Sequence, residues 1–178
     1  MIGAENQQER LIKVGWIVGF IDGEGCFSIG IVQQKNGLKR KGYRLGFQVS
    51  HELAVTQGKK SPDSLREIQK YFGVGRIYGN KRYDNHKENL YRYVVRKRED
   101  LCNVIIPFFK KYKLRTSKRY DFEKFTKVVD LVLQGEHLKK DGLIEIVKIV
   151  ETMNRCKPHD PLIKILTHYT SGTEWWIS

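Results

Sequence analysis

Apolar residues in the first part of the chain recur at the spacing of a helix face. After a polar lead, the apolar positions are Leu11, Val14, Ile17, Val18 and Ile21. Side chains three or four residues apart lie on one face of an α-helix. The pattern therefore predicts a helix of about 15 residues that ends near Gly23.

The pattern then changes to the alternation of a β-strand. Between Cys26 and Gln34, one face carries Phe27, Ile29 and Ile31, and the other carries Ser28, Gly30 and Val32. A basic stretch with an Asn-Gly turn signal, KNGLKRKG, precedes a second alternating segment, residues 43–50, whose inward residues are Leu45, Phe47 and Val49. Two alternating segments joined by a turn predict a β-hairpin.

A second helix and two shorter strands are expected in the middle of the chain. The stretch SPDSLREIQKYFG has a candidate N-cap in Ser61, Pro62 at the first helical position and Gly73 at its end. Short strands are expected at residues 76–80 and 90–96, on either side of a polar stretch.

The last half of the chain has the periodicity of helices, at residues 99–106, 117–134 and 141–153. Pro107 and the basic stretch KKYKLRTSK are expected to interrupt the first two helices, and Gly135 is expected to end the second. This order of elements predicts an α+β fold with one antiparallel sheet. We expect a single domain that spans residues 1–178.

Gly15, Gly19 and Gly23 share one stripe of the first predicted helix. A glycine inside a helix costs roughly 0.5 to 1 kcal/mol relative to alanine, so some close contact is expected to offset it. One interpretation is a second helix that packs along the stripe. The alternative is a helix packed closely on its own sheet.

Asp22 and Glu24 lie where this helix is expected to end, at the negative end of its dipole. An acid there is disfavoured by up to about 1 kcal/mol, and a bound cation would reverse the sign. The Glu24 carboxylate, a backbone carbonyl such as that of Gly23 and phosphate oxygens are the hard ligands that magnesium prefers. The alternative is a solvated Asp-Gly-Glu-Gly turn.

The net charge narrows the class of partner. The 178 residues include 33 Lys and Arg against 20 Asp and Glu, a formal net charge of +13 at pH 7. Such an excess predicts attraction to a polyanion. Nucleic acid is favoured over a membrane surface, because no basic amphipathic anchor or lipidation signal is present. A basic protein whose charge serves solubility alone is the alternative.

Cysteine spacing and the first residues bear on the compartment. Cys26, Cys102 and Cys156 have no close paired spacing, so neither a disulfide framework nor a zinc site is indicated. The chain starts without the pattern of a secretory signal, and no apolar run approaches the roughly 20 residues of a membrane span. We expect an intracellular protein, in the cytoplasm or an organelle, with no membrane partner.

The stretch IVGFIDGEG, residues 17–25, resembles the LAGLIDADG motif. Gly19 and Gly25 match its glycines, Asp22 matches its first acid, and Glu24 stands where the motif has its second acid, an aspartate. The later segments GFQVSHE and IIPFFKKYKLRTSKRYDF also resemble the LAGLIDADG homing endonucleases. The resemblance covers residues 10–135 and implies an αββαββα core with a four-stranded antiparallel DNA-binding sheet, followed by a helical extension at 136–178.

A single motif in the chain implies a homodimer in which two motif helices pack side by side. The interface residues that the resemblance implies are Gly15, Val18, Gly19 and Asp22. It also implies that the Glu24 carboxylates lie beside the scissile phosphates and share magnesium ions with them, while Asp22 braces the turn. A two-fold symmetric dimer is expected to read a palindromic or pseudopalindromic site.

The other catalytic candidates also come from the resemblance. The family has a polar, water-organising residue after the FQV segment, which corresponds to His51, with Gln48 expected to face the same region. An ordinary surface histidine is the alternative. A basic residue that stabilises phosphate charge corresponds to Lys113, Arg115 or Lys118, because the segment aligns in more than one register; Lys118 is favoured.

The outward face of the predicted sheet carries side chains suited to DNA. Arginine can pair with guanine and Gln or Asn with adenine in the major groove. The candidates on this face are Ser28, Gly30, Gln34, Arg44, Gln48, Arg76, Tyr78, Asn80, Arg92 and Arg96. Lys35, Lys39, Arg40, Lys41, Lys81 and Arg82 lie in turn segments and are expected to contact phosphates. For each of them, a merely solvated side chain is the alternative.

The resemblance therefore implies a site-specific homing endonuclease that uses Mg²⁺ to hydrolyse phosphodiester bonds of double-stranded DNA. Cleavage of a long pseudopalindromic target would promote the mobility of its intron or intein. The rival interpretation is a catalytically silent LAGLIDADG protein that acts as an RNA maturase or as a DNA-binding regulator. A basic structural or ribosome-associated protein without a site is a third.

Overall fold

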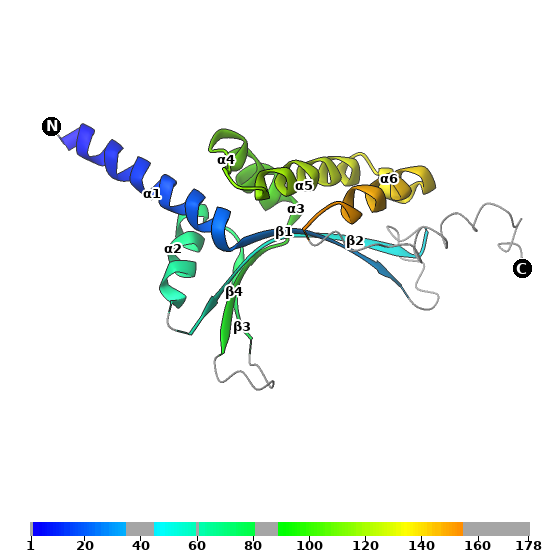
Figure 1. The fold of residues 1–178 in the computed structure, drawn as a ribbon, viewed down its shortest axis with the longest axis horizontal. Helices are drawn as coiled ribbons and strands as arrows, with labels where there is room; N and C mark the ends of the chain where they lie inside the picture. Colours follow the sequence, from blue (N-terminus) through cyan, green and yellow to red (C-terminus); the bar gives the residue numbers. More distant parts are fainter. Residues whose placement is uncertain (1, 35–44, 60, 81–88, 155–178) are drawn as a thin grey trace, which may run out of the picture. The chain divides into compact units, whose positions relative to one another are not determined.

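The computed structural model of the protein describes residues 2–34, 45–59, 61–80 and 89–154 (Figure 1). The DNA-binding candidates outside these ranges are Lys35, Lys39, Arg40, Lys41, Arg44, Lys81 and Arg82, and most of the extension expected at 136–178 also lies outside them. Within the described ranges, no helix has both the length and the apolar character of a membrane span.

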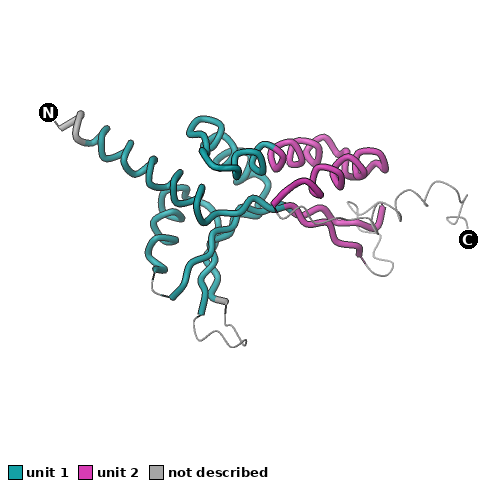
Figure 2. The backbone as a smooth tube through the Cα atoms, in the orientation of Figure 1, with its two compact units in different colours: residues 1–28, 51–123 teal, residues 29–50, 124–178 magenta. Residues whose placement is uncertain are grey.

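The chain divides into two compact units (Figure 2). Unit 1 comprises residues 1–28 and 51–123, and unit 2 comprises residues 29–50 and 124–178. The long strands of the hairpin and one helix run from one unit into the other. The expectation of a single domain over the whole chain stays a prediction.

The element order confirms the expected α+β fold. Helices and strands follow one another as α1 (Ile2–Glu24), β1 (Gly25–Gln33), β2 (Phe47–Gly58), α2 (Pro62–Phe72), β3 (Arg76–Asn80) and β4 (Leu90–Val95), before a helical part. The four strands form one sheet in the order β1-β2-β4-β3. β4 pairs antiparallel with both β2 and β3.

Helix α1 is 23 residues long, longer than the predicted 15 or so. The apolar pattern marks only its buried part, where Val14, Ile17 and Ile21 are at most 8% exposed. Residues 6–10 are polar and exposed, and they include Gln, Glu and Arg, which form helices well without burial. The polar lead is therefore helical as well.

The core of unit 1 lies where β2 and β4 pair. Leu53 is opposite Val95 and Val55 is opposite Tyr93, and all four side chains are fully buried. Three aromatic rings from separate elements meet in the same unit, since the rings of Phe27, Phe109 and Phe122 contact one another edge to face. These contacts tie the first residues of β1 to the helices that follow the sheet.

Helix α2 matches the expectation closely. It begins at Pro62 after Ser61, and Gly73 ends it in the left-handed conformation, with φ of 68°. The Ser61 side chain makes no capping hydrogen bond; its carbonyl instead accepts one from the Ser64 hydroxyl, at 2.7 Å. The helix is thus bounded as predicted, by a different contact.

Pro107 does not interrupt its helix, contrary to the sequence prediction. Helix α3 (Arg98–Asp100) continues through a π-helical segment, η1 (Leu101–Ile105), into α4 (Ile106–Lys111). The N–H of Ile106 donates to the carbonyl of Leu101, five residues earlier. A wider turn just before a proline accommodates its ring and its missing N–H, so the chain stays helical through Pro107.

Unit 2 is built around helices on the far part of the hairpin strands. Helix α5 (Lys118–Leu133) ends before Gly135, whose φ of 76° stops it as predicted, and η2 (Glu136–Leu138) and α6 (Lys140–Glu151) follow. Two apolar clusters form its core. Their buried members are Phe47, Leu143 and Val147 in one, and Val128, Val132, Ile146 and Val150 in the other.

Candidate active site

Helix α1 passes into strand β1 with no loop between them, as the blue ribbon of Figure 1 shows. Gly25 makes this junction possible, because a Cβ at this position would lie 2.6 Å from the carbonyl oxygen of Ile21. The last helical residue is Glu24, and its side chain is exposed. Within the described part of the chain its carboxylate has no hydrogen bond or ion pair, so it is available to a ligand.

Asp22 is buried and binds the segment that precedes α5. Its carboxylate accepts hydrogen bonds from the N–H of Arg115 at 2.8 Å, from the N–H of Thr116 at 3.0 Å and from the hydroxyl of Thr116 at 2.6 Å. Burial alone would raise the pKa of Asp22, but these hydrogen bonds and the nearby Lys118 outweigh it and lower the pKa. Asp22 therefore stays charged and braces the end of α1.

Lys118 binds the last carbonyls of α1. Its Nζ donates to the carbonyl oxygens of Ile21 at 3.2 Å, Asp22 at 2.7 Å and Gly23 at 3.0 Å. These oxygens have no partner within the helix, and a cation at a helix C-terminus is favoured by the dipole. Burial lowers the pKa of Lys118, although Asp22, Cys26 and Glu24 nearby favour its charged form. A positive charge is thus held one residue away from Glu24.

Thr116 connects these two contacts. Its hydroxyl donates to Asp22 and accepts from the N–H of Lys118, at 3.2 Å. The end of α1 and the start of α5 are therefore joined by side chains in both directions. Sequence reasoning did not find Thr116. Its place before a helix start, typical of a capping residue, is the signal that could have identified it.

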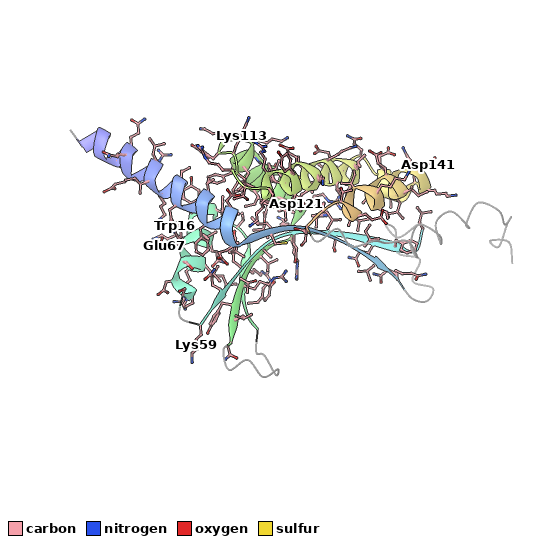
Figure 3. All side chains as sticks on the ribbon, viewed as in Figure 1. Trp16, Lys59, Glu67, Lys113, Asp121 and Asp141 are labelled. Atoms are coloured by element: carbon pink, nitrogen blue, oxygen red, sulfur yellow. The ribbon has the colours of Figure 1, made fainter. Side chains whose placement is uncertain are left out.

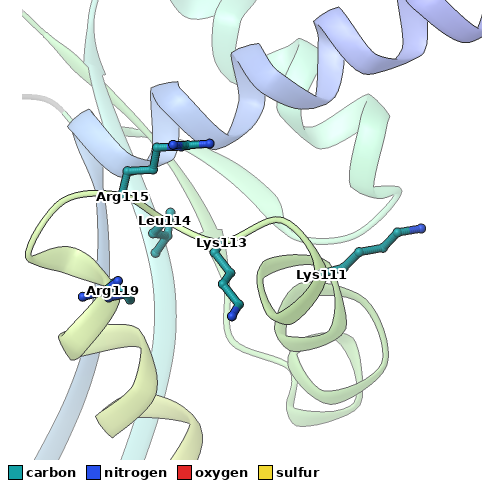
Figure 4. Close-up of a pocket in the computed structure, with 5 residues that line it drawn as sticks. All are labelled: Lys111, Lys113, Leu114, Arg115 and Arg119. Atoms are coloured by element: carbon teal, nitrogen blue, oxygen red, sulfur yellow. The ribbon is translucent and has the colours of Figure 1, made fainter.

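Lys113 and Arg115, the other two basic candidates, lie differently. With Lys111, Leu114 and Arg119 they line a surface pocket of about 470 Å³ (Figure 4). The N–H of Arg115 binds Asp22, while its side chain lines this pocket. Lys113 is also labelled in the view of all side chains (Figure 3). Of the three basic candidates, Lys118 is the one whose side chain contacts the end of α1.

His51 is only 8% exposed, so it is not the ordinary surface histidine of the alternative interpretation. It lies in β2 two residues before the buried Leu53, and strand alternation gives both the same face. Gln48 belongs to unit 2 and His51 to unit 1. The expectation that Gln48 faces the same region stays a prediction. Gln48 accepts a hydrogen bond from Gln34, at 2.9 Å.

The donor set at the end of α1 is small. Within the described residues, no group of three or more His, Cys, Asp or Glu side chains is arranged to hold a metal ion. This chain offers the Glu24 carboxylate and the Gly23 carbonyl, whose oxygen has a second lone pair beyond the one that Lys118 uses. Magnesium usually keeps several waters and takes one or two carboxylates plus phosphate oxygens, so the two donors fit it.

The glycine stripe of α1 is open. Gly15, Gly19 and Gly23 are exposed, and a Cβ added at each would meet no atom within 4 Å. Close packing of α1 on its own sheet therefore does not explain these glycines. Val18, next to Gly19, is half-buried. Leu11, one helical turn before Gly15, is 58% exposed.

Residues 17–129 identify the family of the chain. The family model described as LAGLIDADG endonuclease matches residues 17–129, from the end of α1 into α5. The chain belongs to the LAGLIDADG endonuclease family. The order of elements that the motif implied is thus confirmed together with the family.

Other proteins resemble the chain over most of its length. An uncharacterized 50.9 kDa protein in ND4 intron 1 of Podospora anserina is 36% identical over 127 residues, which are 70% of this chain and 25% of the relative. The crystal structure of the homing endonuclease I-TnaI is 34% identical, with a TM-score of 0.69 over 88% of this chain and 96% of that one.

A second solved structure, I-SmaMI bound to uncleaved DNA target in the presence of calcium ions, is 33% identical. Its TM-score is 0.68 over 81% of this chain and 45% of the I-SmaMI chain. The chain spans between 22% and 40% of the length of the first five curated relatives it matches.

The described DNA-binding candidates of this LAGLIDADG chain differ in exposure. Gln34, Arg76, Tyr78 and Arg96 are exposed, Ser28, Gly30, Gln48 and Arg92 are half-buried, and only the backbone of Asn80 is described. Arg92 and Arg96 both donate to the carboxylate of Glu52 in β2. Sequence reasoning missed Glu52. Its signal was an acid in alternation with Gln48 and Ser50 on a face otherwise assigned to DNA.

Proposed function

We propose that the protein is a site-specific homing endonuclease that makes a double-strand break in a long pseudopalindromic DNA target and so promotes the mobility of its intron or intein. The observation that carries the proposal is the end of α1. An exposed Glu24 carboxylate stands there beside the Lys118 ammonium, in a chain with a formal net charge of +13. Acid, cation and overall charge all suit phosphodiester hydrolysis in DNA.

The comparisons support DNA as the substrate. I-SmaMI, one of the similar structures, is described as bound to an uncleaved DNA target with calcium ions. Calcium and magnesium share oxygen ligands, but magnesium demands a tighter octahedral geometry. The target of I-SmaMI is uncleaved in the presence of calcium ions, which supports Mg²⁺ as the active ion proposed for this chain.

The open glycine stripe supports a homodimer. The chain carries one motif, and its match covers 45% of the I-SmaMI chain, a share close to one half. Gly15, Gly19 and Gly23 offer a surface that another helix backbone can approach, and none of the residues that the structure describes occupies it. A second copy of α1 on this stripe would bring two Glu24 carboxylates together, with Val18 at the edge of the contact.

Each side chain at the end of α1 has one role in the proposed phosphodiester hydrolysis. Glu24 and the carbonyl of Gly23 would hold the magnesium ion together with phosphate oxygens. Bound magnesium supplies an activated water and stabilises the leaving oxygen. Lys118 keeps a positive charge beside Gly23, where it would stabilise negative charge on the phosphate. Asp22 and Thr116 fix the position of Lys118 relative to α1.

The role of His51 and the roles of Lys113 and Arg115 are separate proposals. His51, a buried residue of β2, would organise the attacking water. Lys113 and Arg115 belong to the basic pocket and would hold flanking phosphates. Neither role is needed for Glu24 and Lys118 to act.

Cleavage of a randomised duplex library tests the proposal. The wild-type protein should enrich symmetric sites that are cut with magnesium and only bound with calcium. Glu24→Gln should retain binding to those sites and lose cleavage by at least about a hundredfold, since it removes the metal-binding charge. Glu67→Gln, which removes an exposed acid of α2, is the matched control and should cleave normally.

Two results would contradict the proposal. Cleavage by Glu24→Gln at the wild-type rate would remove Glu24 from the site. Tight binding of structured RNA, with no DNA cut under any metal condition, would favour the maturase interpretation instead.

A further inference from the structure

Glu52 is an acid in the middle of a basic sheet face. In unit 1, strand alternation puts Glu52, Ala54 and Thr56 of β2 on the same face. Ala54 is opposite Val94 and Thr56 is opposite Arg92, and extending this register by one pair puts Arg96 opposite Glu52. A carboxylate here would repel the phosphates of any DNA on this face, so its presence calls for an explanation.

The carboxylate of Glu52 is shared between two arginines of β4. Its Oε1 accepts from Nη2 of Arg92, and its Oε2 accepts from Nε of Arg96 at 2.7 Å. Both oxygens are used, on two separate guanidinium groups. The Glu52 side chain is 18% exposed, while those of Arg92 and Arg96 are 38% and 60% exposed. The acid is thus covered, and the two arginines remain accessible.

The donors that stay free are suited to a base edge. A guanidinium has five N–H donors in a fixed plane. Arg96 uses Nε on Glu52, which leaves both Nη groups, the pair that can bind O6 and N7 of guanine together. Arg92 uses Nη2 and keeps Nη1 and Nε. Glu52 therefore fixes the plane of each arginine without consuming its capacity to read a base.

The neighbouring small residues allow this arrangement. Arg92 is four residues from Arg96 along β4, with Val94 between them on the same face. Ala54 and Val94 are 4% and 3% exposed, although they share this face. The aliphatic parts of arginine side chains that extend towards Glu52 are suited to provide such cover.

We propose that Glu52 is a positioning residue for DNA recognition, which holds Arg92 and Arg96 ready to read two base pairs of the target. The proposal rests on the proposed function, since it requires that the sheet binds DNA. A long arginine side chain loses conformational freedom when it binds a base, and an arginine that is already held loses less. Glu52 would therefore increase discrimination between bases more than total affinity.

The test compares selections from a randomised duplex library. Arg92→Lys and Arg96→Lys first identify the base pairs that each arginine reads, because lysine does not form the same two-donor contact. Glu52→Gln should weaken the preference at those same base pairs roughly tenfold, the order of magnitude of one lost two-donor contact. Its affinity for a duplex of random sequence should not fall. Glu67→Gln (Figure 3) removes the same charge elsewhere and should leave every preference unchanged.

Outcomes separate this inference from the proposed function. If the wild-type protein enriches no sequence, both fail. If wild type and Glu52→Gln enrich the same bases with equal strength, Glu52 has no role in recognition and the proposed function stands. Should Glu52→Gln not fold, Glu52→Asp keeps the charge on a shorter side chain. It should still weaken the preference at the base pairs read by Arg92 and Arg96, and unchanged preferences there would overturn the inference.

Discussion

Tyr93 is the largest of the fully buried side chains, and its hydroxyl donates to the carbonyl of Val74 at 2.9 Å. Burial raises the pKa of Tyr93 well above its ordinary value of 10.0, with a smaller contribution from Asp100. The folded protein therefore keeps this phenol neutral at a pH where the unfolded chain ionises it. Stability from Tyr93 is complete below about pH 10 and is lost as the pH rises above it.

Tyr93→Phe should show this sign directly. At pH 7 it should lower the free energy of unfolding by about 1 kcal/mol, because the Val74 carbonyl loses its partner. The difference in the free energy of unfolding between variant and wild type should narrow as the pH is raised above about 10. The wild type loses stability there, whereas phenylalanine has no proton to lose. Urea unfolding from pH 7 to 11 measures it. Tyr78→Phe, which replaces a 45% exposed tyrosine, is the control and should show no such difference in the free energy of unfolding.

At the scale of single residues, the sequence indicated which residues have a role better than it indicated their contacts. The motif pointed to Asp22 as a brace, and the structure supplies its partners, Arg115 and Thr116, more than 90 residues later. Periodicity carries no information about which distant loop meets a carboxylate. For the same reason nothing in the sequence marks Glu52, which follows the strand predicted at residues 43–50, as the common acceptor of two arginines.

At the scale of the element, α1 has two kinds of glycine. Gly19 faces open space, whereas Gly25, at the start of β1, is in close contact with the backbone of Ile21. The two positions look alike in the motif. Only the structure separates a glycine that could serve a partner from one that the chain itself requires.

Alanine substitutions should separate them by experiment. Gly19→Ala should stabilise the isolated monomer by about 0.5 to 1 kcal/mol, because alanine favours the helix and meets no neighbour. In the proposed dimer the same methyl group would keep two helices apart and weaken association. Gly25→Ala should destabilise the monomer. Urea unfolding and sedimentation of dilute protein measure both effects; unchanged association of Gly19→Ala would contradict the dimer contact.

Helix boundaries were predictable where a local signal set them. Gly73 and Gly135 ended helices as expected, since each adopts a backbone conformation that other residues avoid. Pro107 was misread because the rule that proline breaks helices assumes regular α-helical hydrogen bonds. A π-helical turn before it changes that assumption, and no pattern of apolar residues signals such a turn.

At the scale of the whole molecule, charge and motif predicted family and fold, but not the division into two units. The hairpin strands were expected as one alternating pattern, yet their residues belong to different units. A pattern along one strand cannot show where contacts with distant helices change. Composition predicts a class of partner for a related reason: net charge is a sum, independent of where residues lie.

Mixing wild-type protein with Glu24→Gln tests the assembly. If two chains share one site and exchange freely, an equal mixture contains roughly one quarter wild-type dimers, and double-strand cleavage should fall to roughly that fraction. Nicked DNA should appear as the product of mixed dimers. A chain that cuts both strands alone would retain roughly one half of its activity in the same mixture.

In the proposed site, the direct passage from Glu24 into Gly25 fixes which side chains of β1 face the DNA relative to the bond that is cut. One residue inserted at this junction would turn every following side chain of the strand to the opposite face, because the period of a strand is two. Recognition on that strand and the place of hydrolysis would therefore be coupled by covalent geometry. Variants with new specificity would inherit the same offset between the bases they read and the bond they break.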